Sequence, residues 1–321
     1  PIDAAGGSWG VETLTKQITE KIWAEFQKVE EMGGIIKALE AGYPQAQVAD
    51  VLAKRFKALE MRSDRAVGVN MYPNMTEEPL ERREEDTPKL KKEREAAVAA
   101  YVADIDTNYL AGKLAAVETV EGTIEAFSNG ATIGQVAAAS CKAEAPETVE
   151  AIAAHHWTER YEALRFDTED YVKKTGKNVE VFLCNMGPIP QHKARADFST
   201  SFLQVGEFNV HLNNGFQDDE GKPGSRYEKC VEALKAGIDE NGTPYDVAVI
   251  CSTDATYPED VPALAPMIKA ANPNITLFLA GAAPKDLEPV YKEAGVDDFI
   301  SVKANCFQTL KMLQKKKGMI E

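Results

Sequence analysis

The second half of the chain constrains the fold most, because residues 179–321 repeat a strand-then-helix pattern five times. The clearest strands are two apolar runs, DVAVIC at residues 246–251 and ITLFLA at residues 275–280. Nearly continuous apolar runs of this length are typical of strands that are covered on both faces. The pattern therefore predicts an α/β domain with a buried parallel sheet.

The positions of the repeats also predict how the sheet is ordered. The expected strands lie at residues 179–184, 208–212, 246–251, 275–280 and 298–302. The expected helices lie at residues 192–204, 226–237, 258–271, 285–294 and 305–316. Right-handed crossovers between such units give a five-stranded parallel sheet with helices on both sides. We expect the flavodoxin-like strand order 2-1-3-4-5.

The first 178 residues are mainly helical in pattern and divide into two parts. Residues 1–75 hold three expected helices, at 13–32, 35–41 and 45–63, and one short strand, Val67 to Met71. A lone strand cannot form a sheet. We therefore expect residues 1–75 to be the end of a larger domain, or to pair with something outside the chain. Residues 76–178, which begin with a charge-dense stretch, are expected to form a helical linker.

Composition excludes several classes of partner. The chain has 51 acidic and 36 basic residues and a formal net charge of −15, which argues against a nucleic-acid partner. No apolar run reaches the ~20 residues of a membrane span, and no secretory signal pattern occurs. We therefore expect neither nucleic acid nor membrane as a partner.

The cysteines and histidines favour a reducing compartment, the cytoplasm, and no metal site. The five cysteines are odd in number and far apart, and no CxxC occurs, so neither a disulfide framework nor a zinc site is expected. The adjacent His155 and His156, expected to open the last helix before the sheet, would point to different helix faces. They make a poor metal pair.

The first place to look for a ligand is the loop Asn185 to His192, which follows the first expected strand of the sheet. In open α/β sheets, ligands bind in the crevice beyond the carboxyl ends of the strands. Ser252 follows the third strand and Gly281 follows the fourth, so both belong to the same edge.

Several ordered motifs resemble the acyl-CoA mutases. Residues 3–12, DAAGGSWGVE, resemble a segment late in the barrel of these enzymes, and residues 42–45 and 68–73 resemble the barrel's end. The order of the segments is similar to that in the methylmalonyl-CoA mutase family. The resemblance implies that residues 1–75 end a (β/α)8 barrel, that 76–178 form the helical linker and that 179–321 form a cobalamin-binding-like domain.

The resemblance also implies a cofactor signature, from which the first loop departs. The family's closing domain carries DxHxxG after the first strand, and its His ligates the cobalt of cobalamin. Aligned on Met186-Gly187, Ile189 takes the Asp position, Gln191 takes the ligand His position and Ala194 takes the closing Gly position. His192 lies one residue late, and we expect it to be a capping or surface residue at the start of the helix.

The other two signatures are only partly kept. The family's SxL after the third strand becomes Ser252-Thr253-Asp254, and its GG after the fourth becomes Gly281-Ala282. The degenerate cofactor positions are therefore Gln191, His192, Ser252 and Gly281. We expect no catalytic residue, no metal ligand and no cofactor bound by this chain.

This pattern resembles the non-catalytic, small-subunit branch of the methylmalonyl-CoA mutase family. The resemblance implies a heterodimer in which a catalytic large subunit holds adenosylcobalamin. That partner would interconvert methylmalonyl-CoA and succinyl-CoA through radicals, with the present chain in support and without an active site of its own.

Two alternatives remain open, of which the first also follows from the resemblance. In the first, the chain binds a corrinoid with the cofactor's own base on the cobalt, which needs no ligand His, and takes part in the isomerisation. In the second, the domain is a receiver-like module. Asp254 follows the third strand, but Asn185 has no neighbouring acidic pair, which disfavours this second alternative. Hydrolytic catalysis finds little support, because Ser252 is not in a GxSxG elbow.

Overall fold

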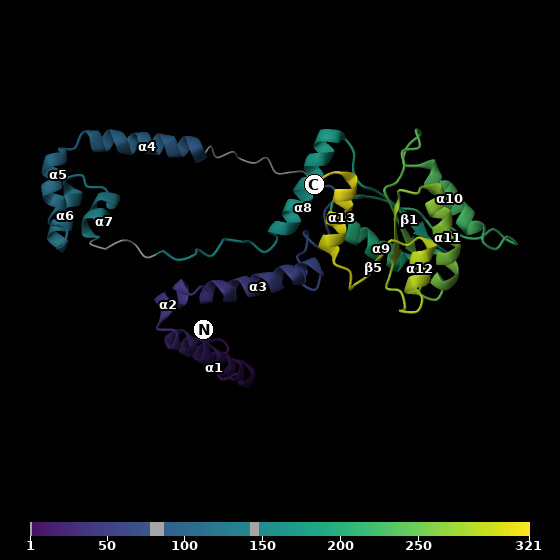
Figure 1. The fold of residues 1–321 in the computed structure, drawn as a ribbon, viewed down its shortest axis with the longest axis horizontal. Helices are drawn as coiled ribbons and strands as arrows, with labels where there is room; N and C mark the ends of the chain where they lie inside the picture. The colour runs from purple at the N-terminus through teal and green to yellow at the C-terminus, as the bar shows by residue number, and fades with distance from the viewer. Residues whose placement is uncertain (1, 78–86, 142–147) are drawn as a thin grey trace. The chain divides into compact units, whose positions relative to one another are not determined.

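The computed structural model describes residues 2–77, 87–141 and 148–321 (Figure 1). The chain divides into two compact units, of which one combines residues 1–77 with 151–321 and the other spans 78–150. The charge-dense start of the expected linker, at residues 78–86, lies outside the described part, as do residues 142–147. Each unit is described by itself below.

The sheet has the composition and order that the sequence predicts. Its strands are β1 (Glu180–Asn185), β2 (Asn209–His211), β3 (Val247–Cys251), β4 (Thr276–Ala280) and β5 (Asp298–Ile300). All neighbouring pairs are parallel, and the order is β2-β1-β3-β4-β5. The flavodoxin-like α/β fold is therefore confirmed. The order reverses between β1 and β3, which is the point where such sheets bind ligands.

Helices cover both faces of the sheet (Figure 1). They are α8 (Glu159–Thr175), α9 (Ile189–Gln204), α10 (Ser225–Ala236), α11 (Tyr257–Ala271), α12 (Glu288–Ala294) and α13 (Cys306–Lys317). Along β1, Val181 and Leu183 pack with α8, α9 and α13. Phe182 and Cys184 point to the other face and pack with α10, α11 and α12. Burial on both faces explains the continuous apolar runs.

The first 77 residues contribute three helices: α1 (Trp9–Glu31), α2 (Ile35–Glu40) and α3 (Tyr43–Glu60). The end of α3 is bonded to the α/β part. The hydroxyl of Tyr161 on α8 donates to the carbonyl of Leu59 at 3.2 Å, and the amide of Asn305 donates to the carboxylate of Glu60 at 3.2 Å. In contrast, α1 leaves its apolar stripe exposed, including Ile22 and Phe26.

The prediction of a short strand from Val67 to Met71 is wrong. This segment forms a turn, in which the Gly68 N–H donates to the Met71 carbonyl at 2.7 Å, and its pairing is limited to one isolated bridge. The buried side chain of Asn70 holds the turn by donating to the carbonyl of Leu59 at 2.9 Å. Among the described residues, no strand lies beside this segment to complete a ladder, so its backbone bonds close locally.

The second unit is wholly helical where it is described. Its helices are α4 (Thr87–Ala103), α5 (Thr107–Leu114), α6 (Val120–Ser128) and α7 (Ile133–Ser140). Side-chain caps define the short ones. Asp106 accepts two backbone N–H bonds at the start of α5, Thr119 caps α6, and Thr132 with Gln135 forms a capping box on α7.

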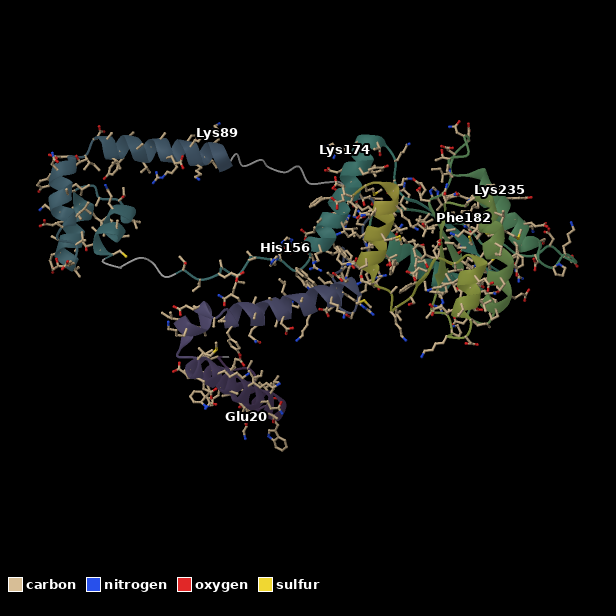
Figure 2. All side chains as sticks on the ribbon, viewed as in Figure 1. Glu20, Lys89, His156, Lys174, Phe182 and Lys235 are labelled. Atoms are coloured by element: carbon tan, nitrogen blue, oxygen red, sulfur yellow. The ribbon has the colours of Figure 1, made fainter. Side chains whose placement is uncertain are left out.

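The two adjacent histidines lie in the segment before α8 instead of opening that helix (Figure 2). His155 Nδ1 lies 2.8 Å from a Glu159 carboxylate oxygen, and His156 Nε2 lies 2.8 Å from a Glu162 carboxylate oxygen. Their partners are therefore the first-turn carboxylates of α8.

No helix in the described ranges is both long and apolar enough to cross a membrane.

Candidate functional site

The crevice at the carboxyl ends of β1, β3, β4 and β5 is the candidate site. Gln191 enters it from the first turn of α9, which begins at Ile189 after the loop that ends in Pro188. Pro188 and Pro190 suit this position, because the first N–H groups of a helix have no intrahelical partner to lose. Both prolines therefore help to start α9 directly after the loop.

The amide of Gln191 is used within the protein. Its Nε2 donates to the hydroxyl of Ser252 at 3.1 Å. Its side chain also lies against Gly187, whose φ of +79° and missing Cβ leave the necessary space. At the position where the resemblance places a ligand histidine, Gln191 therefore joins α9 to the loop after β3.

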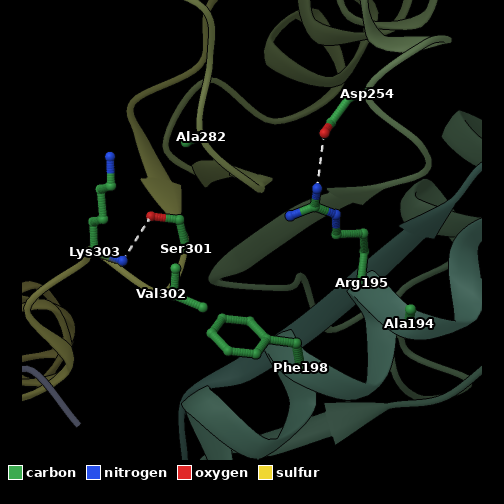
Figure 3. Close-up of a pocket in the computed structure, with 8 residues that line it drawn as sticks. All are labelled: Ala194, Arg195, Phe198, Asp254, Ala282, Ser301, Val302 and Lys303. Carbon is green, nitrogen blue, oxygen red and sulfur yellow. Dashed lines mark hydrogen bonds and ion pairs between the residues drawn. The ribbon is translucent and has the colours of Figure 1, made fainter. Parts of the chain in front are cut away.

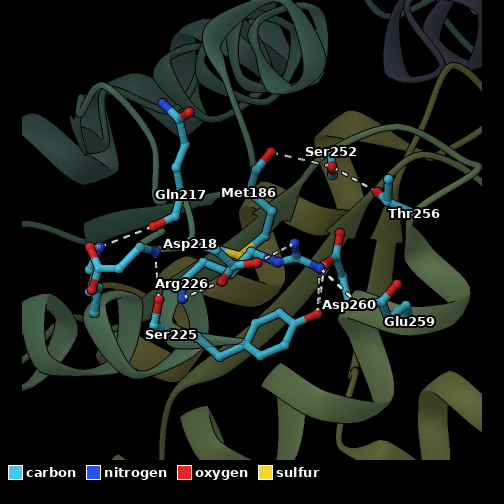
Figure 4. A network of polar contacts seen from close by, with 12 residues as sticks. Met186, Gln217, Asp218, Ser225, Arg226, Ser252, Thr256, Glu259 and Asp260 are labelled. Atoms are coloured by element: carbon cyan, nitrogen blue, oxygen red, sulfur yellow. Dashed lines mark hydrogen bonds and ion pairs between the residues drawn. The ribbon is translucent and has the colours of Figure 1, made fainter. Parts of the chain in front are cut away.

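Ser252 is fully buried and is a structural junction. Its hydroxyl donates to the Met186 carbonyl at 3.3 Å and accepts from the hydroxyl of Thr256 at 2.8 Å (Figure 4). Its backbone N–H donates to the hydroxyl of Tyr257 at 3.0 Å. Burial raises the pKa of the Tyr257 phenol, so this hydroxyl stays protonated and can donate to the Ala280 carbonyl. These contacts include no base that could activate Ser252.

His192 is buried, at 3% exposure, and the expectation of a capping or surface residue is wrong. It shares the inward side of α9 with Ala196 and Ser199, at helical spacing. Its Nδ1 lies 3.1 Å from the Gly187 carbonyl, and its ring packs against Gly215, whose φ is +88°. The ring is therefore held beneath the loop after β2, and helix periodicity explains why a shift of one residue from position 191 changes its direction.

Gly281 is covered by the side chain of Arg195, which is not among the site residues expected from the sequence. A Cβ built on Gly281 would lie 2.9 Å from Nη1 of Arg195. The other terminal nitrogen, Nη2, lies 2.8 Å from Oδ1 of Asp254 (Figure 3). The spacing could have indicated Arg195, because it lies four residues after Gln191 and therefore on the same side of α9.

A cavity of about 380 Å³ lies beside this ion pair (Figure 3). Its lining is mostly apolar, with Phe198 and Val302 facing one another, and it contains neither His nor Cys. The lining residues are Ala194, Arg195, Phe198, Asp254, Ala282, Ser301, Val302 and Lys303. Within the described ranges, no group of three His, Cys, Asp or Glu side chains could hold a metal ion.

A second polar network, which was not expected from the sequence, connects the loop before α10 to α11 (Figure 4). The guanidinium of Arg226 bonds to Asp218 at 3.0 Å and to the buried Asp260 at 3.0 Å. The hydroxyl of Tyr227 donates to the same Asp260 oxygen at 2.9 Å. Burial raises the pKa of Tyr227 to about 12, which keeps this donor protonated.

These residues do not fit a histidine-ligated corrinoid. Gln191 donates to Ser252 instead of presenting an imidazole, His192 is turned under a loop, and Arg195 lies over Gly281. The crevice lies where open α/β sheets bind ligands, but its polar side chains are bonded to one another: Gln191 to Ser252, and Arg195 to Asp254.

Comparisons with known proteins agree with the resemblance recognised in the sequence. The family model described as methylmalonyl-CoA mutase matches residues 1–145. The methylmalonyl-CoA mutase small subunit of Porphyromonas gingivalis is 26% identical over 318 residues, which are 99% of this chain and 40% of the relative. A probable small subunit of Mycobacterium bovis is 25% identical over 317 residues, 99% of this chain and 38% of the relative.

The large subunit is similar to a comparable degree. That of P. gingivalis is 25% identical over 312 residues, 92% of this chain and 42% of the relative. The chain spans about two fifths of the length of these curated relatives. It is thus similar to the methylmalonyl-CoA mutases, and the similarity to sequences named small subunit extends along nearly its whole length.

Proposed function

We propose that this chain is a portion of a non-catalytic subunit that supports a methylmalonyl-CoA mutase. In this proposal a large subunit performs the adenosylcobalamin-dependent radical interconversion of methylmalonyl-CoA and succinyl-CoA. The cofactor supplies the radical chemistry, and the protein that binds it positions and shields it. The present chain binds no corrinoid and contributes stability to the assembly.

The observation that carries the proposal is the internal pairing in the crevice. Gln191 stands at the ligand position and is bonded to Ser252, and Arg195 is bonded to Asp254. A corrinoid would have to break both contacts and would gain no imidazole ligand in return. The same observation disfavours a corrinoid bound with its own base on the cobalt, because Arg195 lies over Gly281 whichever base ligates the metal.

The partner is inferred from the relatives. Proteins named small and large subunit of methylmalonyl-CoA mutase occur in the same organism, P. gingivalis. Both are similar to this chain, which supports a pairing of two related subunits in a heterodimer. We expect the interface to be large, as in obligate complexes.

Co-purification from the native source tests both parts of the proposal. The expected result is a complex with a larger chain, in which the corrinoid absorbance follows the larger chain after the two are separated. A monomeric protein that carries stoichiometric corrinoid on the present chain would overturn the proposal.

A further inference from the structure

We propose that Arg195 and Asp254 form a plug that occupies the space directly above Gly281 and excludes corrinoids independently of the missing ligand histidine. The inference rests on the proposed absence of a corrinoid from this chain. The plug is a second barrier to a corrinoid, because Arg195 occupies the space above Gly281 regardless of which residue stands at the position of the ligand histidine.

The space above Gly281 is occupied by the side chain of Arg195. Gly281 follows β4 and has a φ of +131°. A glycine at the carboxyl end of a strand leaves room for close approach to the backbone. Here the guanidinium of Arg195 takes that room, because a Cβ on Gly281 would lie 2.9 Å from its Nη1, 3.1 Å from its Cζ and 3.5 Å from its Nη2.

An ion pair with Asp254 holds the guanidinium of Arg195 in this position. Asp254 accepts from Nη2 of Arg195 at 2.8 Å. Arg195 stands on α9, which follows β1, whereas Asp254 lies in the loop after β3. The pair therefore spans the point where the strand order reverses, where open α/β sheets bind ligands. Figure 3 shows Arg195 extending from α9 toward Asp254.

The plug is separate from Gln191, the residue at the position of the ligand histidine. Gln191 closes the crevice on the side of Ser252, whereas Arg195 closes it over Gly281. Replacing Gln191 by histidine would restore a cobalt ligand and leave the guanidinium in place. A corrinoid would then still have to displace Arg195 from Gly281 and from Asp254.

The plug can be removed without disrupting the fold. The side chains of Arg195 and Asp254 are 35% and 69% exposed, so the ion pair is screened by water. Exposed pairs of this kind contribute little to stability. A variant without the guanidinium should therefore keep its fold, which circular dichroism and the melting temperature would verify.

The test is binding of hydroxocobalamin to the full chain, measured by equilibrium dialysis and by the absorbance change on histidine ligation. The proteins are the wild type, Gln191→His, and Gln191→His combined with either Arg195→Ala or Lys193→Ala. Lys193 is the matched control, because it is an exposed cation on the same helix, paired with Asp197 at 2.9 Å.

We expect no binding to the wild type, and binding to Gln191→His/Arg195→Ala at least about tenfold tighter than to Gln191→His. We expect the Lys193→Ala combination to bind like Gln191→His alone. Combined with Gln191→His, Asp254→Ala should reproduce part of the gain in affinity caused by Arg195→Ala, because the guanidinium then loses the carboxylate that holds it over Gly281.

Two outcomes would overturn the plug. One is equal affinity of Gln191→His with and without Arg195, and the other is no binding by any variant, which would place the barrier elsewhere. Binding by the wild type would instead contradict the proposed function, so the two failures are distinguishable.

Discussion

The side-chain amide of Gln191 donates to the hydroxyl of Ser252 at 3.1 Å and so joins α9 to the loop after β3. The bond lies where the strand order reverses, beside β1 and β3. It connects two of the positions at which the resemblance to the acyl-CoA mutases places the cofactor signature. In this chain the two side chains are hydrogen-bonded to each other, and their bond helps to hold α9 against the loop after β3.

Ser252→Ala should destabilise the protein more than Gln191→Ala. The buried Ser252 hydroxyl has three partners, namely Gln191, Thr256 and the carbonyl of Met186, whereas Gln191→Ala removes one of these bonds. Loss of the serine leaves buried groups unpaired, and we expect a cost of about 1–3 kcal/mol, against roughly 1 kcal/mol for the glutamine. Urea denaturation measures both. Equal stability of Ser252→Ala and the wild type would contradict the junction role.

Asp260→Asn should lower the free energy of unfolding by about 2–3 kcal/mol. Asp260 is 1% exposed and accepts from Arg226 and Tyr227, so the change removes the charge that compensates a partly buried guanidinium. Arg226 keeps Asp218, which places the expected cost below that of an isolated buried pair. Urea denaturation again gives the value.

The control for Asp260 is its neighbour Glu259, which also bonds to Arg226, at 3.2 Å. The side chain of Glu259 is 79% exposed, so Glu259→Ala should change stability by no more than about 0.5 kcal/mol. Similar effects of the two variants would show that burial does not decide the strength of this network.

Stability should fall as the pH rises above about 10, the ordinary pKa of tyrosine. Burial raises the pKa of Tyr161, of Tyr257 and, to about 12, of Tyr227. Below the ordinary pKa these phenols are protonated in both states, so they add no pH dependence. Above it the unfolded chain loses their protons first, which favours unfolding.

Phenolate absorbance checks the alkaline prediction. The buried tyrosines should ionise together with the loss of helical circular dichroism, later than the exposed ones. Ionisation of all ten tyrosines in one step near the ordinary pKa, with the fold intact, would contradict it.

His156 should titrate above the ordinary pKa of histidine. The hydrogen bond to Glu162 raises the pKa of His156, because it favours the protonated ring. The associated stability is present below the unfolded pKa and is lost as the pH rises through the folded pKa. An NMR titration should show that Glu162→Gln lowers the pKa of His156. Asp170→Asn, farther along α8, should leave it unchanged, and a pKa insensitive to Glu162→Gln would rule out this pairing.

The sheet and the departure from the cofactor signature can both be predicted from the amino-acid sequence alone. The apolar runs at residues 246–251 and 275–280 became β3 and β4, because strands covered on both faces need apolar side chains in both directions. The presence of Gln191 at the position of the ligand histidine also follows from the sequence, because it depends only on the spacing from Met186-Gly187.

Which side chains contact one another depends on how distant segments of the chain pack. The turn at Val67 to Met71 depends on whether a strand lies beside it, and the burial of His192 depends on the loop after β2. The position of Arg195 over Gly281 joins residues 86 positions apart. Contacts of this kind form between segments that are distant in the sequence, so the local periodicity of apolar residues cannot predict them.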